Sequence, residues 1–216
     1  TSQYRTWISA IEADVQNGEV VAGDDLKSVA ARHIEDMRKA ADRIDAGIRL
    51  LEGNPESLRA FRLANRAMQL QRARQEWVRG GAKGAVGDGS DATWRPFQIA
   101  YVLLNLPGIT DPTHEDREVA DLLWFPTGGG KTEAYLGLVA YVILLRRIRN
   151  SSAMGVAVIM RYTLRLLTIQ QFERASMLMC SLETVRKDNP DLGSRPFSIG
   201  LWVGAGATPN SVAEAR

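Results

Sequence analysis

The residues best suited to chemistry lie between Thr127 and Thr132, where the sequence is Thr-Gly-Gly-Gly-Lys-Thr. Successive glycines let a backbone turn so that several N–H groups point at one centre, and a helix that follows adds the positive end of its dipole. Lys131 can then reach the β and γ phosphates of a nucleotide, and the Thr132 hydroxyl group can hold Mg²⁺. The segment is therefore predicted to be a phosphate-binding loop.

The sequence on either side of this loop supports the prediction. Asp121 to Phe125 is a short apolar run of strand character, and Ala134 to Leu145 is a long apolar run of helical length. A strand before the loop and a helix after it are the context that such a loop requires. The strict phosphate-loop pattern begins with a glycine where this chain has Phe125. The alternative, a glycine turn that happens to precede Lys-Thr, therefore stays open.

Length and composition indicate a globular protein. With 216 residues and 45% hydrophobic content, the chain can form one large domain, or one domain and a smaller unit. A net charge of +2 gives no general reason to expect a polyanionic partner. The single cysteine, Cys180, excludes an internal disulfide framework and fits a reducing cytosol. No apolar run reaches the roughly 20 residues that span a bilayer, so no membrane association is predicted.

The first 79 residues are predicted to form a helical accessory region. Apolar residues recur at alternating steps of four and three from Ala30 to Leu51, which predicts a helix that Asp24 or Asp25 caps. Asn54 is predicted to cap the next helix, with Pro55 as its first residue. Arginines 59, 62 and 66 share a face of that helix, and a solvated face is favoured over a nucleic-acid ridge.

A glycine-rich stretch divides this region from the rest of the chain. Residues 80 to 93 have the composition of a flexible linker, and residues 94 to 216 are predicted to form the second domain. A helix over residues 94 to 106 has Pro96 in its first turn. It places Gln98 near its start, where an amide could contact the edge of an adenine base.

Three apolar runs alternate with long helical segments in the second domain: Val119–Phe125, Gly155–Met160 and Ser198–Val203. Strand, helix, strand, helix, strand is the pattern of a parallel α/β sheet. Ligands of such sheets bind beyond the carboxyl ends of the strands. The phosphate loop and residues 161 to 165 and 204 to 210 are therefore expected along one rim.

Four segments carry a resemblance to a known family: WRPFQIAYVLLNL, DLLWFPTGGGKTEAYLGL, RYTLRLLTIQQFERA and SIGLWVGAGATPN. They resemble the first RecA-like motor domain of superfamily 2 helicases and translocases, and in particular the DrmA family of helicase subunits from the DISARM anti-phage system. The resemblance covers roughly residues 94 to 210. It implies an α/β, RecA-like P-loop domain with a parallel sheet, preceded by an α-helical accessory region.

The resemblance also implies roles for individual residues. Lys131 and Thr132 would be catalytic, and Thr132 would be the Mg²⁺ ligand. The implied ATP contacts are Arg95, Gln98, Thr127, Gly128, Gly129, Gly130, Lys131 and Thr132. The implied nucleic-acid contacts are Arg161, Thr163, Arg165, Thr168, Gln171 and Gly204. The implied partners are DNA, single-stranded or with a single-stranded overhang, and a second subunit of a defence complex in the prokaryotic cytoplasm.

One departure from the family bears on activity. Superfamily 2 motors use an Asp-Glu pair to hold Mg²⁺ and activate water, and no Asp-Glu pair occurs in this sequence. We therefore expect a fragment of an ATP-dependent DNA helicase or translocase that binds nucleotide weakly and does not hydrolyse it alone. Two alternatives stay open: a non-catalytic module with a RecA-like fold that binds DNA or a partner, and a P-loop enzyme such as a small-molecule kinase.

Overall fold

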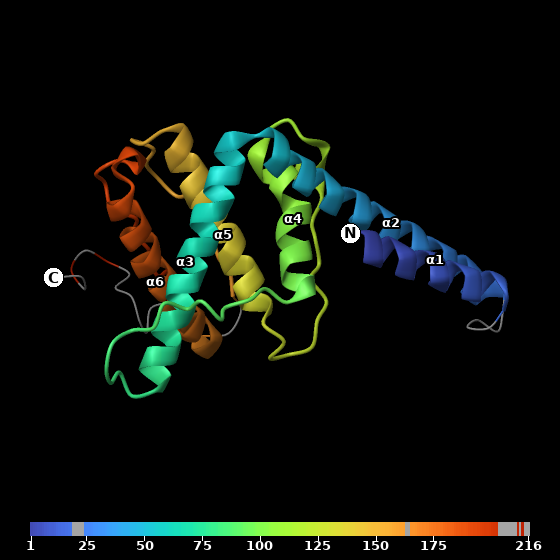
Figure 1. Ribbon diagram of the computed structural model, residues 1–216, viewed down its shortest axis with the longest axis horizontal. Helices are drawn as coiled ribbons and strands as arrows, with labels where there is room; N and C mark the ends of the chain where they lie inside the picture. Colours follow the sequence, from blue (N-terminus) through green and yellow to red (C-terminus); the bar gives the residue numbers. More distant parts are fainter. Residues whose placement is uncertain (19–23, 163–164, 203–210, 212, 214–216) are drawn as a thin grey trace. The chain divides into compact units, whose positions relative to one another are not determined.

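The described part of the chain is helical. A computed structural model describes residues 1–18, 24–162, 165–202, 211 and 213, without the side chains of residues 24, 25 and 165–168. The elements are α1 (Ser2–Gln16), α2 (Asp24–Gly53), α3 (Pro55–Arg79), α4 (Pro96–Thr110), η1 (Glu115–Glu118), α5 (Lys131–Arg149), α6 (Arg165–Asp188) and η2 (Pro190–Leu192) (Figure 1). Within these residues there is no strand and no sheet.

The predicted α/β, RecA-like P-loop domain with a parallel sheet is therefore wrong for the described residues. The runs at residues 119–125, 155–160 and 198–202 have no regular secondary structure, and Val203 lies outside the description. A strand forms only where its N–H and C=O groups pair with a neighbouring strand. Here the apolar side chains are exposed, with 86% for Leu122, 84% for Ile159 and 98% for Trp202. Apolar composition indicated burial, but the described chain supplies no pairing partner.

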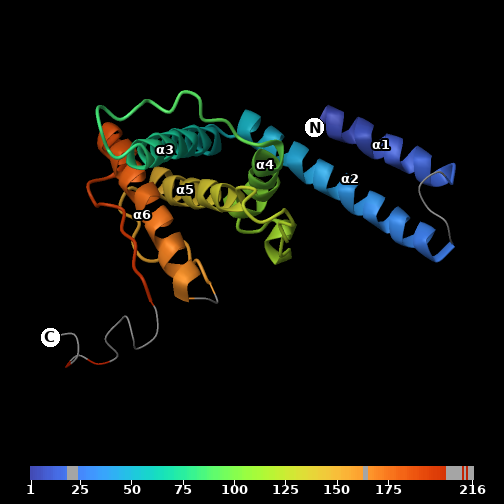
Figure 2. The same ribbon diagram turned by 90° about the horizontal axis from the view of Figure 1, so that it is seen from below.

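The chain divides into two compact units. One comprises residues 1–58 and 94–135, and the other comprises residues 59–93 and 136–216. In the first unit α1 and α2 lie side by side and antiparallel (Figures 1 and 2). Ile8 of α1 packs with Ile34 and Ala41 of α2 in a buried cluster. The apolar stripe predicted on α2 is thus confirmed.

The boundary between α2 and α3 also follows the prediction. Helix α2 ends at Gly53 and α3 begins at Pro55. The Ser57 N–H group donates to Oδ1 of Asn54 at 2.9 Å, which satisfies one of the orphan donors at the helix start. Asn54 is therefore the N-cap that the sequence predicted.

Helix α4 passes through Pro107 and ends at Thr110, beyond the predicted end at Leu106. Proline has no N–H group, so the carbonyl oxygen of Leu103 has no helical partner at position 107. Gly47 of α2 lies against this carbonyl, and a Cβ atom at position 47 would be 2.0 Å from the Leu103 oxygen. The packing of α4 on α2 therefore requires glycine at position 47.

Replacing Gly47 with alanine is expected to lower the free energy of unfolding by about 2 kcal/mol or more, because the added methyl group must push two backbones apart. Gly53→Ala is the matched control, since a Cβ atom there would meet nothing within 4 Å. The control should be neutral or stabilise by up to ~1 kcal/mol. Urea unfolding of both variants provides the measurement. Equal midpoints for the two variants would show that the α2–α4 contact is not tight.

In the second unit, side chains of α3 hold α6. The Arg74 guanidinium group donates to the hydroxyl groups of Ser181 and Thr184, both at 2.8 Å. The Gln71 amide donates to the carbonyl oxygen of Arg174 at 3.1 Å. Arg59 pairs with Asp191 at 2.5 Å, so this member of the predicted arginine face has an acidic partner. The flexibility expected for residues 80 to 93 stays a prediction.

Candidate functional site

The glycine loop forms a turn at the start of α5. Gly128 and Gly130 have φ angles of +78° and +93°, in the left-handed region that favours glycine. The Gly129 N–H group donates to the carbonyl oxygen of Pro126 at 3.1 Å and closes the turn. Because α5 begins at Lys131, the N–H groups of its first turn have no acceptor within the helix. The predicted order of glycine turn and helix start is present, without the strand before it.

The Lys131 side chain folds back over this turn. Its Nζ atom donates to the carbonyl oxygen of Phe125 and, at 3.3 Å, to that of Pro126. Thr132 follows in the first turn of α5 and is half-buried. Two carbonyl oxygens of the predicted phosphate-binding loop therefore accept hydrogen bonds from this ammonium group. The catalytic roles of Lys131 and Thr132 stay predictions, and so does the contact predicted for Thr127.

The first turn of α4 clamps the glycine loop. Gln98 is only 5% exposed, and its side-chain oxygen accepts a hydrogen bond from the Arg95 N–H group at 2.8 Å. The Gln98 side-chain nitrogen donates to the carbonyl oxygen of Gly130, and Nη1 of Arg95 donates to that of Gly129, both at 2.7 Å. The structure thus brings Arg95 and Gln98 to the loop. Their adenine contact stays a prediction.

Two phenylalanines join the same arrangement, and the sequence reasoning did not identify their role. The rings of Phe97 and Phe125 are stacked, with centroids 3.8 Å apart and planes inclined by 14°. The Phe125 ring also covers Gly129, where an added Cβ atom would be 2.4 Å from Cδ1 of that ring. The sequence feature that could have indicated this role is Phe125 itself, because the strict phosphate-loop pattern has glycine at that position. Packing therefore requires glycine at position 129, whereas the left-handed φ angles favour glycine at positions 128 and 130.

Arg43 of α2 anchors the segment that leads into the loop. Its Nη1 and Nη2 atoms donate to the two carboxylate oxygens of Asp121 at 2.6 and 2.8 Å, and its Nε atom donates to Asp116 at 2.8 Å. These hydrogen bonds, that to Asp121 first, raise the pKa of the Arg43 guanidinium group above its ordinary value, although burial opposes the shift.

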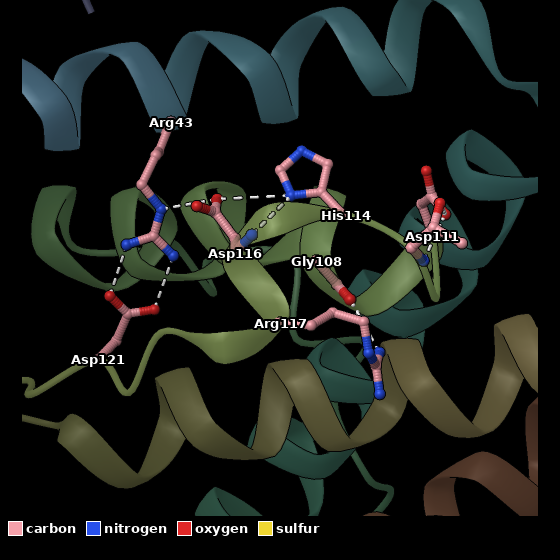
Figure 3. A network of polar contacts seen from close by, with 8 residues as sticks. Arg43, Gly108, Asp111, His114, Asp116, Arg117 and Asp121 are labelled. Carbon is pink, nitrogen blue, oxygen red and sulfur yellow. Dashed lines mark hydrogen bonds and ion pairs between the residues drawn. The ribbon is translucent and has the colours of Figure 1, made fainter.

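Figure 3 shows Arg43 between the two carboxylates, with His114 beside Asp116. The Nδ1 atom of His114 accepts a hydrogen bond from the Asp116 N–H group at 3.1 Å and caps η1. Arg117 donates to the carbonyl oxygen of Gly108 at 2.9 Å and ties η1 back to α4. No local pattern indicates this network, because Arg43 and Asp121 are 78 positions apart in the sequence.

The residues predicted to contact nucleic acid belong to the second unit. Arg161 is exposed, and Gln171 of α6 has a buried side-chain oxygen without a hydrogen-bond partner among the described residues. Both line a cavity of about 1600 Å³ in that unit. Arg165 and Thr168 lie on α6, but their side chains are not described, and Thr163 and Gly204 lie outside the described residues. These contacts stay predictions.

Neither a metal-binding cluster nor a membrane-spanning helix occurs among the described residues. No group of three or more His, Cys, Asp or Glu side chains among them could hold a metal ion. None of the helices in the described ranges is long and apolar enough to cross a membrane.

A comparison with protein-family models finds no match. The chain is 38% identical over 223 aligned residues to DISARM protein DrmA of Bacillus paralicheniformis. The alignment covers 98% of this chain and 19% of that protein. The chain is therefore a homologue of part of DrmA and spans about a fifth of its length, which confirms the predicted relationship to DrmA, whereas the predicted helicase assignment stays a prediction.

Proposed function

We propose, from the homology to DrmA and the geometry of the glycine loop, that this chain binds the triphosphate of ATP through residues 127–132. In the complete protein it would serve an ATP-dependent DNA helicase or translocase that acts in anti-phage defence. The observation that carries the proposal is the Lys131 ammonium group, which lies over a glycine turn at the start of α5. The positive end of a helix dipole and a nearby cation both attract negative charge, so the start of α5 together with Lys131 is suited to a triphosphate.

The clamp from α4 supports this fit. In a trans peptide the C=O group and the following N–H group point in opposite directions. Because the carbonyl groups of Gly129 and Gly130 are turned toward Arg95 and Gln98, the N–H groups of Gly130 and Lys131 point away from α4. Two successive amides aimed to one side are suited to an oxyanion. Space remains at Gly128, where an added Cβ atom would meet nothing within 4 Å.

This chain would supply the groups that neutralise phosphate charge, and the rest of the protein would supply the others. Lys131 would neutralise phosphate charge, and the Thr132 hydroxyl would hold Mg²⁺, which when bound neutralises charge on the β and γ phosphates. The chain lacks an Asp-Glu pair, so activation of water falls to residues outside it. DNA, with Arg161 and Gln171 among its contacts, and a second protein subunit are the proposed partners.

Titration of labelled ATP with and without Mg²⁺ tests the assignment of Thr132. Thr132→Val should bind ATP without Mg²⁺ as tightly as the wild type does. The factor by which Mg²⁺ increases the affinity for ATP should fall on the order of tenfold, because one metal ligand is removed. Thr6→Val is the matched control, since that hydroxyl group donates to the Ser2 carbonyl group in α1, outside the glycine loop.

Two results would argue against the proposal. An unchanged effect of Mg²⁺ in Thr132→Val would remove Thr132 from the metal site. Binding of DNA by a protein that binds no ATP under either condition would favour the non-catalytic module.

A further inference from the structure

Phe125 connects the Lys131 side chain to the rest of the glycine loop. Its carbonyl oxygen accepts a hydrogen bond from Nζ of Lys131, its ring covers Gly129, and the same ring stacks on Phe97 at 3.8 Å. Phe97 lies in the first turn of α4, between the two residues that clamp the loop. Phe97 therefore fixes the Phe125 ring, and Phe125 in turn fixes the Lys131 ammonium group.

This arrangement competes with phosphate binding. An ammonium group has three N–H donors, and Lys131 directs two of them at the carbonyl oxygens of Phe125 and Pro126. The amine must leave these oxygens before more than one of its N–H donors can face a β or γ phosphate. When only a fraction of a protein is in the binding-competent state, the apparent affinity is reduced by that fraction.

We propose that Phe97 is a positioning residue that keeps the phosphate loop closed, with Lys131 turned onto the Phe125 carbonyl group, and that ATP binds only when this contact opens. The inference rests on the proposed function. It predicts that weakening the Phe97–Phe125 stack increases the affinity for ATP. A residue with a merely structural role would weaken ATP binding when it is replaced.

The test compares ATP·Mg²⁺ affinity in the wild type, Phe97→Leu and Phe97→Tyr. Leucine keeps apolar volume without the aromatic pair and should tighten binding about fivefold, in line with the usual strength of one such pair. Tyrosine keeps the aromatic stack, so Phe97→Tyr should bind ATP with the wild-type affinity. Tyr4→Leu is the control, because Tyr4 stacks on Trp7 within α1, with ring centroids 5.9 Å apart. It should leave the affinity unchanged.

A second readout needs no nucleotide. The rate at which an N-hydroxysuccinimide ester acylates Lys131, followed by peptide mass spectrometry, should rise in Phe97→Leu, because the amine is released from the two carbonyl oxygens. Phe125→Leu should raise the rate in the same way, which keeps the inference testable if Phe97→Leu fails to fold.

The outcomes separate this inference from the proposed function. Tighter binding and faster acylation in the leucine variants would support it. Binding by the wild type with equal or weaker binding in Phe97→Leu, or an unchanged acylation rate, would overturn the inference and leave the proposed function standing. Absence of ATP binding in every protein would overturn both.

Discussion

Lys131→Ala is expected to lower ATP turnover by the complete protein at least about 100-fold, the effect of removing one preorganised charge from a transition state. Alanine removes the side chain beyond Cβ, which leaves the glycine turn and the α4 clamp in place but provides no cation beside the phosphates. Because the Lys131 amine contacts only loop carbonyl oxygens among the described hydrogen bonds, folding should change little. Steady-state ATP hydrolysis with DNA present provides the measurement.

Lys39→Ala is the control for this variant. Lys39 lies on α2 with an amine 3.8 Å from Glu35, in an exposed pair that contributes little to stability. Turnover should be unchanged in the control. Retained turnover in Lys131→Ala would refute the assignment of this loop as the phosphate site.

Arg43→Met is expected to lower the free energy of unfolding by about 3 kcal/mol, because two largely buried carboxylates lose their counter-charge. Side-chain exposure is 21% for Arg43, 13% for Asp116 and 20% for Asp121. Methionine retains most of the apolar stem, so the loss reports the charge rather than the packing. Adding Asp116→Asn and Asp121→Asn to Arg43→Met should recover part of the stability, since the unpaired charges are removed.

Arg38→Met in the same helix is the matched control. Arg38 pairs with Glu12, but its side chain is 43% exposed, and such pairs contribute about 0–1 kcal/mol. Guanidinium chloride unfolding monitored by circular dichroism compares the two variants. A loss in Arg43→Met no larger than that in Arg38→Met would mean that water screens the network.

The helices were predictable where local signals fix them. Asn54 and Pro55 set the start of α3 because capping acts within a few residues. The end of α4 was not predictable, because the Leu103 carbonyl group, which loses its helical partner at Pro107, packs against Gly47, a residue far away in the sequence. Likewise, the sheet was predicted from apolar runs, yet pairing depends on a neighbouring strand and cannot be deduced from a run itself. Trp202, which is 98% exposed, illustrates this difference.

The sequence indicated which residues to consider for the candidate site, but not how they contact one another. Residue types and spacing were sufficient to place Lys131 after three glycines and Gln98 upstream. The sequence could not show that Gln98 holds the Gly130 carbonyl group or that Phe97 stacks on Phe125, because these contacts join separate segments. The sequence also gave no sign that Lys131 would be engaged by its own loop.

Titration of ATP·Mg²⁺ into ¹⁵N-labelled protein is the most direct test of phosphate binding by this loop. The predicted result is that the amide signals of Gly128, Gly129, Gly130 and Lys131 shift most, because the N–H groups of Gly130 and Lys131 would contact the phosphates and the other two residues lie in the same turn. ATP binding that leaves these four signals in place, or no binding at millimolar ATP, would contradict the assignment.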